Sequence, residues 1–219
     1  RVAQAKREVA GLGLVGVPAP FAGPSEAVVV ADASTPAELA AIDVILQAEH
    51  GPDGLAWLVT WDESVADAVT AAVARLVPAS PRREHLEATL AEGRYAVVCD
   101  DRAQALAVAN AIAPEHLELL VDDAEALLPL VRHAGAVFCG PLAPASIGDY
   151  LAGPNHVLPT YGSARFAGAL RVDDFRKHVH VVTVDDKGLA QVAAHVIALA
   201  EYEGLPAHAE SIRLRQEPA

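Results

Sequence analysis

The sequence predicts an α/β fold of the Rossmann-like kind, with a mostly parallel sheet and helices on both of its faces. Short, valine-rich apolar runs alternate with longer segments of helical period, which is the pattern of crossover units in a parallel sheet. Apolar residues make up 53% of the 219 residues and charged residues 21%, which is enough apolar side chain for a sizeable core. The chain ends in two further helical patterns, which predict a small helical tail.

Residues 1–24 are predicted to be the end of a preceding domain and a connector. Residues 1–12 have the pattern of an amphipathic helix, and the connector after them is rich in glycine and proline. Residues 11–16 (GLGLVG) match the dinucleotide-binding pattern GxGxxG. That motif works only between a strand and a helix. Here a helix precedes it and Pro18 and Pro20 come after it, so we predict no cofactor-binding residue in the connector.

Residues 25–166 are predicted to form the α/β domain. Glu26–Asp32 is an apolar run typical of a buried parallel strand. Thr35 and Glu38 have the spacing of a capping box around a proline, which predicts a helix that ends near His50. The same alternation predicts strands at 55–60, 95–99, 117–121 and 136–140, and helices at 62–77, 81–92, 102–112 and 123–133.

The regular period disappears from Pro141 to Gly168, a stretch long enough to suggest a functional loop. Residues 167–219 are predicted to form the tail, with a strand at 180–184 and helices at 186–203 and 207–215.

Charge and composition argue against several classes of function. The net charge of −13 and the absence of a basic stripe disfavour nucleic acid and anionic membranes as partners. Cys99 and Cys139 give no disulfide framework, and no run is long and apolar enough for a membrane span, so we expect a cytoplasmic protein. The chain contains no methionine and starts with Arg1, so we expect it to be processed or part of a longer polypeptide.

Two polar clusters lie at the ends of predicted helices. Gln47 and His50 are three residues apart, so both side chains project from one face and could hold a metal ion. Glu115 and His116 are an adjacent acid and imidazole that could share proton transfer. Taken alone, each pair also fits a solvated helix end or loop, and that structural interpretation is favoured.

Two further clusters lie in the irregular loop and in the tail. Asp149 and His156 offer an oxygen and an imidazole ligand, and Glu203 and His208 lie on either side of a helix break. The structural alternatives are an Asx-turn loop for the first pair and a cap with a surface histidine for the second. Nitrogen and oxygen donors of this kind suit zinc better than magnesium. The residues therefore indicate a candidate zinc site with an acid–base pair nearby, although spacing does not show that they converge.

Several short strings together resemble the histidinol dehydrogenase family. They are Ala22-Gly23-Pro24-Ser25-Glu26, Gln47-Ala48-Glu49-His50, Pro114-Glu115-His116-Leu117, Gly148-Asp149-Tyr150, Asn155-His156-Val157-Leu158-Pro159-Thr160 and the pair Glu203 and His208. The resemblance covers essentially the whole chain but only the C-terminal half of a family member. It implies that the N-terminal half, with most NAD contacts and part of the sheet, is absent.

The resemblance implies an enzyme that oxidises L-histidinol through the aldehyde to L-histidine with two NAD⁺ in succession, at the end of histidine biosynthesis. It implies one zinc ion per site, with Gln47, His50, Asp149 and His208 as ligands. Glu115 and His116 would be the catalytic residues, with Glu115 activating water. Ser25, His156 and Glu203 would contact the substrate, together with His116 and the four ligands. Family members are homodimers, so the tail, with Glu203 and His208, would serve the partner's site, and the fragment alone would be inactive.

The chain departs from the family pattern at a few positions. Leu46 replaces a serine, Ala113 a glycine, and Ala152 and Pro154 a serine and a threonine. None of these is an implied ligand or acid–base residue. Two alternatives stay open: a stand-alone zinc-binding domain with hydrolytic activity, and a non-catalytic assembly module.

Overall fold

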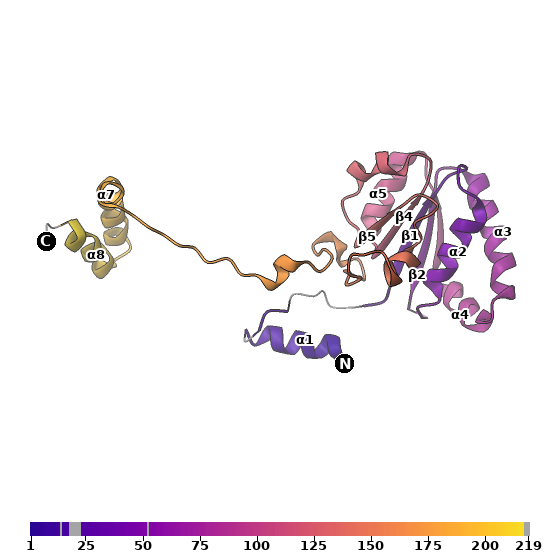
Figure 1. Cartoon of the computed structure of the whole chain (residues 1–219), viewed down its shortest axis with the longest axis horizontal. Helices are drawn as coiled ribbons and strands as arrows, with labels where there is room; N and C mark the ends of the chain where they lie inside the picture. Colours follow the sequence, from indigo (N-terminus) through magenta and orange to yellow (C-terminus); the bar gives the residue numbers. More distant parts are fainter. Residues whose placement is uncertain (14, 18–22, 52, 217–219) are drawn as a thin grey trace. The chain divides into compact units, whose positions relative to one another are not determined.

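The computed structural model describes residues 1–13, 15–17, 23–51 and 53–216. The chain divides into two compact units, Arg1–Arg176 and Lys177–Ala219. The first unit contains the sheet and the second contains two helices (Figure 1).

The first unit is built around five parallel strands in the order β3-β2-β1-β4-β5. The strands are β1 (Glu26–Ala31), β2 (Leu55–Thr60), β3 (Arg94–Val98), β4 (His116–Leu120) and β5 (Ala136–Cys139). Strand order reverses between β1 and β4, as in doubly wound folds. The α/β fold class predicted from the sequence is confirmed.

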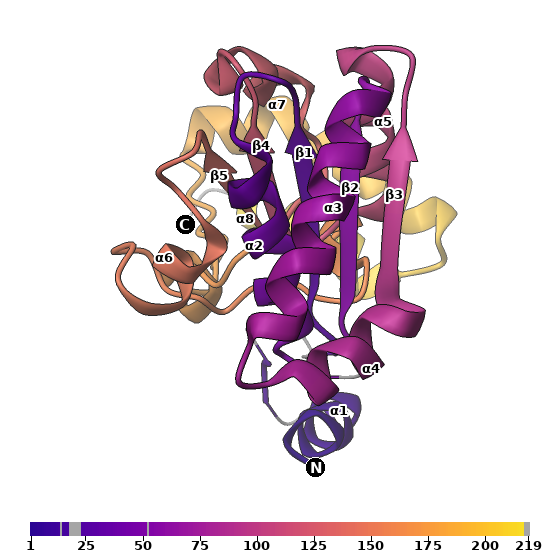
Figure 2. The same cartoon turned by 90° about the vertical axis from the view of Figure 1, so that its right-hand side faces the viewer.

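Helices cover both faces of this sheet, as Figure 2 shows, with α2, α3 and α4 on one face and α5 on the other. The helices of the unit are α1 (Val2–Gly11), α2 (Ala37–Ala48), α3 (Glu63–Ala79), α4 (Arg83–Gly93), α5 (Arg102–Ile112) and α6 (Ala145–Tyr150), with 3₁₀ helices at Ala124–Leu130, Ser163–Arg165 and Val172–Phe175. Because β1 is covered on both sides, all six of its residues are buried. This explains the continuous apolar run in the sequence.

The sheet has an amino edge, where its strands begin, and a carboxyl edge, where they end. Ser25 before β1 and Glu115 before β4 lie at the amino edge, and Asp32 after β1 lies at the carboxyl edge. Helix α2 runs back from the carboxyl edge, so its last turn, with Gln47, lies at the amino edge. Residues from α2, β1 and β4 are therefore brought to one place.

Three sequence predictions about local structure are wrong. Pro36 is itself the N-cap of α2 and no side chain caps that helix, because the helix begins one residue later than a capping box at Thr35 requires. The helix predicted at 123–133 is a 3₁₀ helix, Ala124–Leu130, with Pro129 inside it. Residues 180–184 form no strand, because no neighbouring strand among the described residues pairs with them.

The second unit consists of α7 (Asp186–Tyr202) and α8 (Pro206–Gln216). Asp185 accepts a hydrogen bond from the backbone N–H of Gly188 at 2.7 Å and so caps α7. The break between the helices occurs at Gly204, whose φ of 71° favours glycine. In the part of the chain that the structure describes, no helix has the length and apolar character required to cross a membrane.

Candidate active site

Ser25 joins two segments that are far apart in the sequence. It lies just before β1, and its Oγ donates to Glu115 Oε2 at 2.6 Å and approaches Gln47 Oε1 at 3.3 Å. Gln47 is fully buried on α2 and Glu115 is 8% exposed at the start of β4. The parallel pairing of β1 with β4 places Ala27 opposite His116, which is why the residues before each strand meet.

Glu115 is a desolvated carboxyl group. Burial is the main reason why its pKa is raised to about 7, and the hydrogen bond from Ser25 opposes that shift. The negative charges of Glu26 and Asp149 raise the pKa further. A carboxyl group that titrates near neutral pH can both give and accept a proton under ordinary conditions.

His116 lies beside His156 and forms the imidazole part of the site. The two Nε2 atoms are 2.9 Å apart, so one of them carries a proton in this contact. His156 Nε2 also lies 3.0 Å from Asp149 Oδ1. Burial, together with the nearby imidazoles of His156 and His50, lowers the pKa of His116 to about 3, and its ring is therefore neutral at physiological pH.

A cavity of about 610 Å³ opens beside this cluster. His50, at the end of α2, and Asp149, on α6, both line it, together with Leu46, Glu49, Arg82, Ser146 and Tyr150. His50 is exposed and Asp149 is half-buried, so both side chains are accessible. The structure thus brings two of the residues predicted as metal ligands to one cavity.

Gly148 fixes how closely α6 approaches the sheet. A Cβ at this position would lie 2.6 Å from the ring of Phe138 on β5 and 3.2 Å from the ring of His156. Any larger residue would therefore move α6 away from the sheet, and Asp149 with it.

The described residues contain one group of three side chains whose ligand atoms all lie within 4.8 Å of one another, Glu115, His116 and His156. This group differs from the set predicted from the sequence, although it adjoins it. Gln47 fits a ligand role because its Nε2 is buried without a partner among the described residues. Since the two ends of an amide are exchanged by a half-turn, the amide can turn its oxygen to this position. The nitrogen and oxygen donors at this edge suit zinc.

Two of the predicted site residues lie in the second unit. Glu203 is the C-cap of α7 and His208 is on α8, and both are exposed. Their participation in the site with Gln47, His50 and Asp149 stays a prediction.

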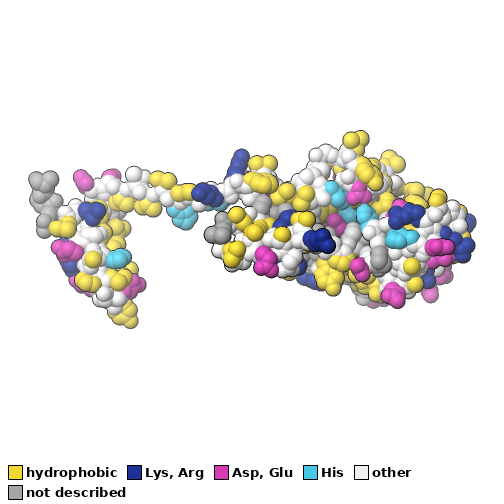
Figure 3. All heavy atoms as spheres, turned by 90° about the horizontal axis from the view of Figure 1, so that it is seen from below, with side chains coloured by type: hydrophobic (Ala, Val, Ile, Leu, Met, Phe, Trp, Pro, Cys, Tyr) yellow, Lys and Arg dark blue, Asp and Glu magenta, His cyan; other side chains and the backbone are white. Residues whose placement is uncertain are grey.

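Polar side chains of the kinds found in the cluster also lie on the surface of the first unit. Histidine and acidic side chains lie side by side on the face shown in Figure 3.

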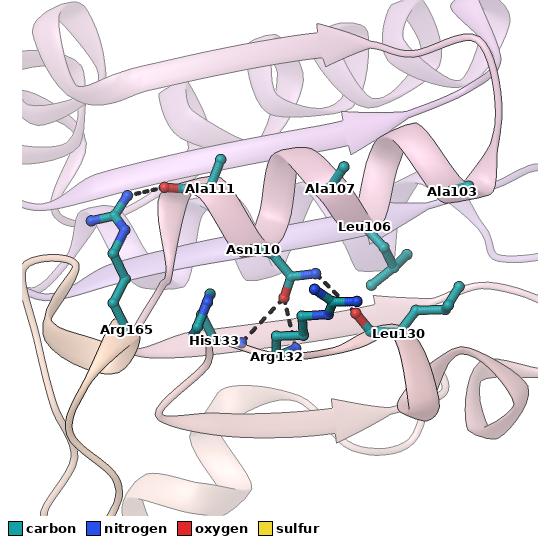
Figure 4. Close-up of a pocket in the computed structure, with 9 residues that line it drawn as sticks. All are labelled: Ala103, Leu106, Ala107, Asn110, Ala111, Leu130, Arg132, His133 and Arg165. Carbon is teal, nitrogen blue, oxygen red and sulfur yellow. Dashed lines mark hydrogen bonds between the residues drawn. The ribbon is translucent and has the colours of Figure 1, made fainter.

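A second cavity, of about 600 Å³, lies along α5 and is shown in Figure 4. Its wall is organised by Asn110, which donates to Leu130 O and accepts from the backbone N–H groups of Arg132 and His133.

Sequence reasoning missed three buried acids. Glu118 is fully buried on β4 and Asp43 is buried on α2, and burial and mutual proximity raise the pKa of Glu118 well above its usual value. Glu26, at the start of β1, is buried as well. A signal was present, since Glu118 interrupts the apolar run of residues 117–121 and Glu26 directly precedes that of residues 27–31.

A doubly wound sheet that carries a desolvated carboxyl group and two contacting imidazoles at one edge defines an α/β protein with an enzyme-type site. The family model described as histidinol dehydrogenase matches residues 1–216. The chain belongs to the histidinol dehydrogenase family, as its sequence strings predicted.

Individual relatives agree with this assignment. The histidinol dehydrogenase of Parasynechococcus marenigrum is 46% identical over 203 residues, which are 93% of this chain and 46% of the relative. That of Chlorobium chlorochromatii is 45% identical over 98% of this chain and 49% of the relative. The Thiocapsa roseopersicina sequence of the same name is 47% identical over the whole chain and 93% of its own length. The chain thus spans about half the length of the first two relatives.

A solved structure gives the same result for the fold. The crystal structure of histidinol dehydrogenase from Elizabethkingia anophelis matches with a TM-score of 0.88 and 33% identity, over 98% of this chain and 49% of that protein.

Proposed function

We propose that this chain supplies the substrate- and zinc-binding part of a histidinol dehydrogenase, which oxidises L-histidinol through the aldehyde to L-histidine. The observation that carries the proposal is the cluster of Ser25, Glu115, His116 and His156 at the amino edge of the sheet, on the scaffold of that family. A buried carboxyl group whose pKa is raised to about 7, beside an uncharged imidazole, suits a reaction that moves a proton at each oxidation step.

Gln47, His50 and Asp149 would hold the zinc ion, with His208 as the fourth ligand. Zinc held there would provide a Lewis-acidic anchor for the imidazole and amino nitrogens of the substrate. The two cavity-lining residues and the unpartnered amide of Gln47 support this assignment.

NAD⁺ would provide the hydride acceptor, and we assign no residue of this chain to it. The helix α1 precedes the glycine pattern of residues 11–16, where a dinucleotide motif needs a strand, which supports this choice.

Each residue of the cluster would have a separate task. His116, neutral because of its lowered pKa, would accept the proton of the substrate hydroxyl at Nε2 in the first oxidation. Glu115 would take a proton from the water that attacks the aldehyde, at a carboxylate oxygen, before the second oxidation. Ser25 holds Oε2 of Glu115 and so orients the other oxygen, Oε1, which lies 3.9 Å from His116 Nε2. Ser25 and His156 would also contact the substrate.

The tail would complete the site of a second subunit. In a homodimer with exchanged tails, Glu203 would contact the substrate and His208 would reach the partner's zinc. Both side chains are exposed in the second unit and therefore accessible for such a contact.

The test uses the longest natural polypeptide that contains this chain. We expect one zinc ion per chain by elemental analysis and NADH formation that depends on histidinol. In Glu115→Gln, the step from aldehyde to acid should slow by about 10²–10⁴-fold, because the general base is lost. Glu125→Gln, which changes an exposed glutamate elsewhere on the unit, is the matched control and should retain full activity.

Two outcomes would contradict the proposal. A zinc-loaded protein that never reduces NAD⁺ with histidinol but hydrolyses an ester or amide with dependence on Glu115 would be a hydrolase. A protein whose activities are all unchanged by Glu115→Gln would use zinc for assembly alone.

A further inference from the structure

Glu26 is a buried acid that has no task in the proposed reaction. It is 3% exposed at the start of β1, directly after Ser25. Its two carboxylate oxygens accept hydrogen bonds from consecutive backbone N–H groups 135 and 136 residues away, Tyr161 to Oε2 at 2.8 Å and Gly162 to Oε1 at 2.7 Å. Both oxygens of the carboxylate are therefore occupied by one turn of the backbone.

That turn binds an anion with consecutive backbone N–H groups, and we call Tyr161–Gly162 the nest. Tyr161 has φ 57° and Gly162 has φ 68°, so two successive residues are left-handed. Their N–H groups converge on the carboxylate of Glu26. A left-handed conformation is unfavourable for tyrosine. The carboxylate of Glu26 compensates for it with two charge-assisted hydrogen bonds.

A second hydrogen bond joins the loop that precedes Tyr161 to the segment that precedes β1. The backbone N–H of Gly23 donates to Thr160 Oγ1 at 2.6 Å. Leu158 and Thr160 are buried, so the loop between His156 and the nest is packed against the unit. We call residues 23–26 and 156–162, joined by these contacts, the strap.

The far end of the strap is attached to α5. Arg165 donates hydrogen bonds to Gly162 O at 3.4 Å and to Ala111 O, and Figure 4 shows its side chain directed at the end of that helix. The loop is thus fixed on two sides, by an acid from β1 and by a cation at the C-terminus of α5.

The strap connects two residues of the candidate active site. Ser25 lies on its first segment and His156 on its second, and His156 faces His116 and Asp149. We propose that Glu26 is a positioning residue that holds His156 and Ser25 in register for substrate binding by clamping the Tyr161–Gly162 nest. This inference rests on the proposed function.

The experiment compares Glu26→Gln, Gly162→Ala and the double variant in the longest natural polypeptide. Gln keeps the shape but presents an amide N–H to one of the two backbone donors, and Ala at position 162 is strained in the left-handed region. We expect each single variant to raise KM for histidinol about tenfold, with kcat changed less than twofold. Ala at position 162 would also place its methyl group 3.0 Å from Arg165 Nη1. The double variant should be no worse than the more impaired single variant, because both substitutions disturb the same turn.

Two matched controls test whether the effect on KM is specific to the contact of Glu26 with Tyr161 and Gly162. Glu38→Gln removes an exposed glutamate of the same unit, and Gly168→Ala adds a methyl group in open space shortly after the nest. Both should leave KM and kcat unchanged.

Amide hydrogen exchange of Tyr161 and Gly162, measured without substrate, separates this inference from the proposed function. Faster exchange in Glu26→Gln supports the clamp even where histidinol is not oxidised. Unchanged exchange, additive effects in the double variant, or a loss confined to kcat would each overturn the inference. If Glu26→Gln does not fold, Gly162→Ala alone decides it by the same measurements.

Discussion

The two edges of the sheet differ in whether all of their buried polar groups find hydrogen-bond partners within the chain. At the carboxyl edge, Asp32 accepts hydrogen bonds from Ser34 N at 2.9 Å, Ser34 Oγ at 2.5 Å and Asp122 N at 3.3 Å, and Arg102 lies 3.7 Å away. At the amino edge, Gln47 Nε2 and His116 Nδ1 are buried without a partner among the described residues.

This difference supports the placement of the proposed site at the amino edge. Ligands of open α/β sheets commonly bind at the carboxyl edge near the reversal of strand order, which here lies next to Asp32. The polar groups around Asp32 are engaged with one another, as expected of a structural network. Buried polar atoms without partners lower stability, and at Gln47 and His116 a bound ligand would offset that cost.

The largest effect on stability should come from Asp32→Asn. The substitution removes the charge that three hydrogen bonds and Arg102 share, so we expect the free energy of unfolding to fall by about 1–3 kcal/mol, with activity within twofold. Urea denaturation measures the first quantity and NADH formation the second. Asp67→Asn, an exposed position on α3, should change neither. A large activity loss in folded Asp32→Asn would mean that the carboxyl edge is functional after all.

Glu118, buried in the middle of β4, should make the stability of the fold depend on pH. Burial, followed by the charge of Asp43, raises the pKa of Glu118 in the folded protein above the usual value of 4.5. The folded state therefore holds a proton that the unfolded state releases above about pH 4.5. This contribution to stability is fully present below that pH and is lost as the pH rises toward the folded pKa.

Glu118→Gln tests that sign. Because glutamine resembles the protonated acid, the variant should be more stable than the parent by about 1–2 kcal/mol at pH 8 and nearly equal to it at pH 4. Denaturant unfolding at pH 4, 6 and 8 gives the comparison, and Glu125→Gln is the exposed control. Equal pH slopes in parent and variant would show that Glu118 is charged in the folded state.

The smallest expected effect concerns backbone strain at the amino edge. Ala113 caps α5 in the left-handed conformation with φ 57°. Ala113→Gly should raise the free energy of unfolding by about 0.5–1 kcal/mol, because glycine adopts this conformation without a steric penalty. In contrast, Ala107→Gly inside the same helix should lower it by about 1 kcal/mol. A destabilised Ala113→Gly would show that the methyl group of this fully buried residue contributes more through packing than it loses in strain.

Much of the fold could be predicted from the sequence because the sheet is buried. Each central strand is an apolar run and each helix has its own period, so alternation alone predicts the parallel architecture. The failed strand at 180–184 shows the limit of that reasoning. An apolar run defines a strand only when another strand pairs with it, and pairing is not a local property.

The site was predictable in composition but not in geometry. Glu115 and His116 adjoin in the sequence, so their pairing could be expected. The contact of Ser25 with Glu115 joins residues 90 positions apart and depends on the register of β1 against β4. The nest for Glu26 depends on backbone torsions at Tyr161 and Gly162, and no residue pattern in the sequence indicated a clamp there.

The close contact between Gly148 and Phe138 has a consequence for how this chain can change. The depth at which Asp149 and His156 face the site is determined by an aromatic ring on β5 and by a missing side chain on α6. An apolar contact thus contributes to the shape of the site beside the polar contacts that position Ser25 and His156. Gly148 and Phe138 thus shape the site without carrying a reactive group. A substitution at a polar residue of the site can therefore change its chemistry while this contact keeps the position of α6.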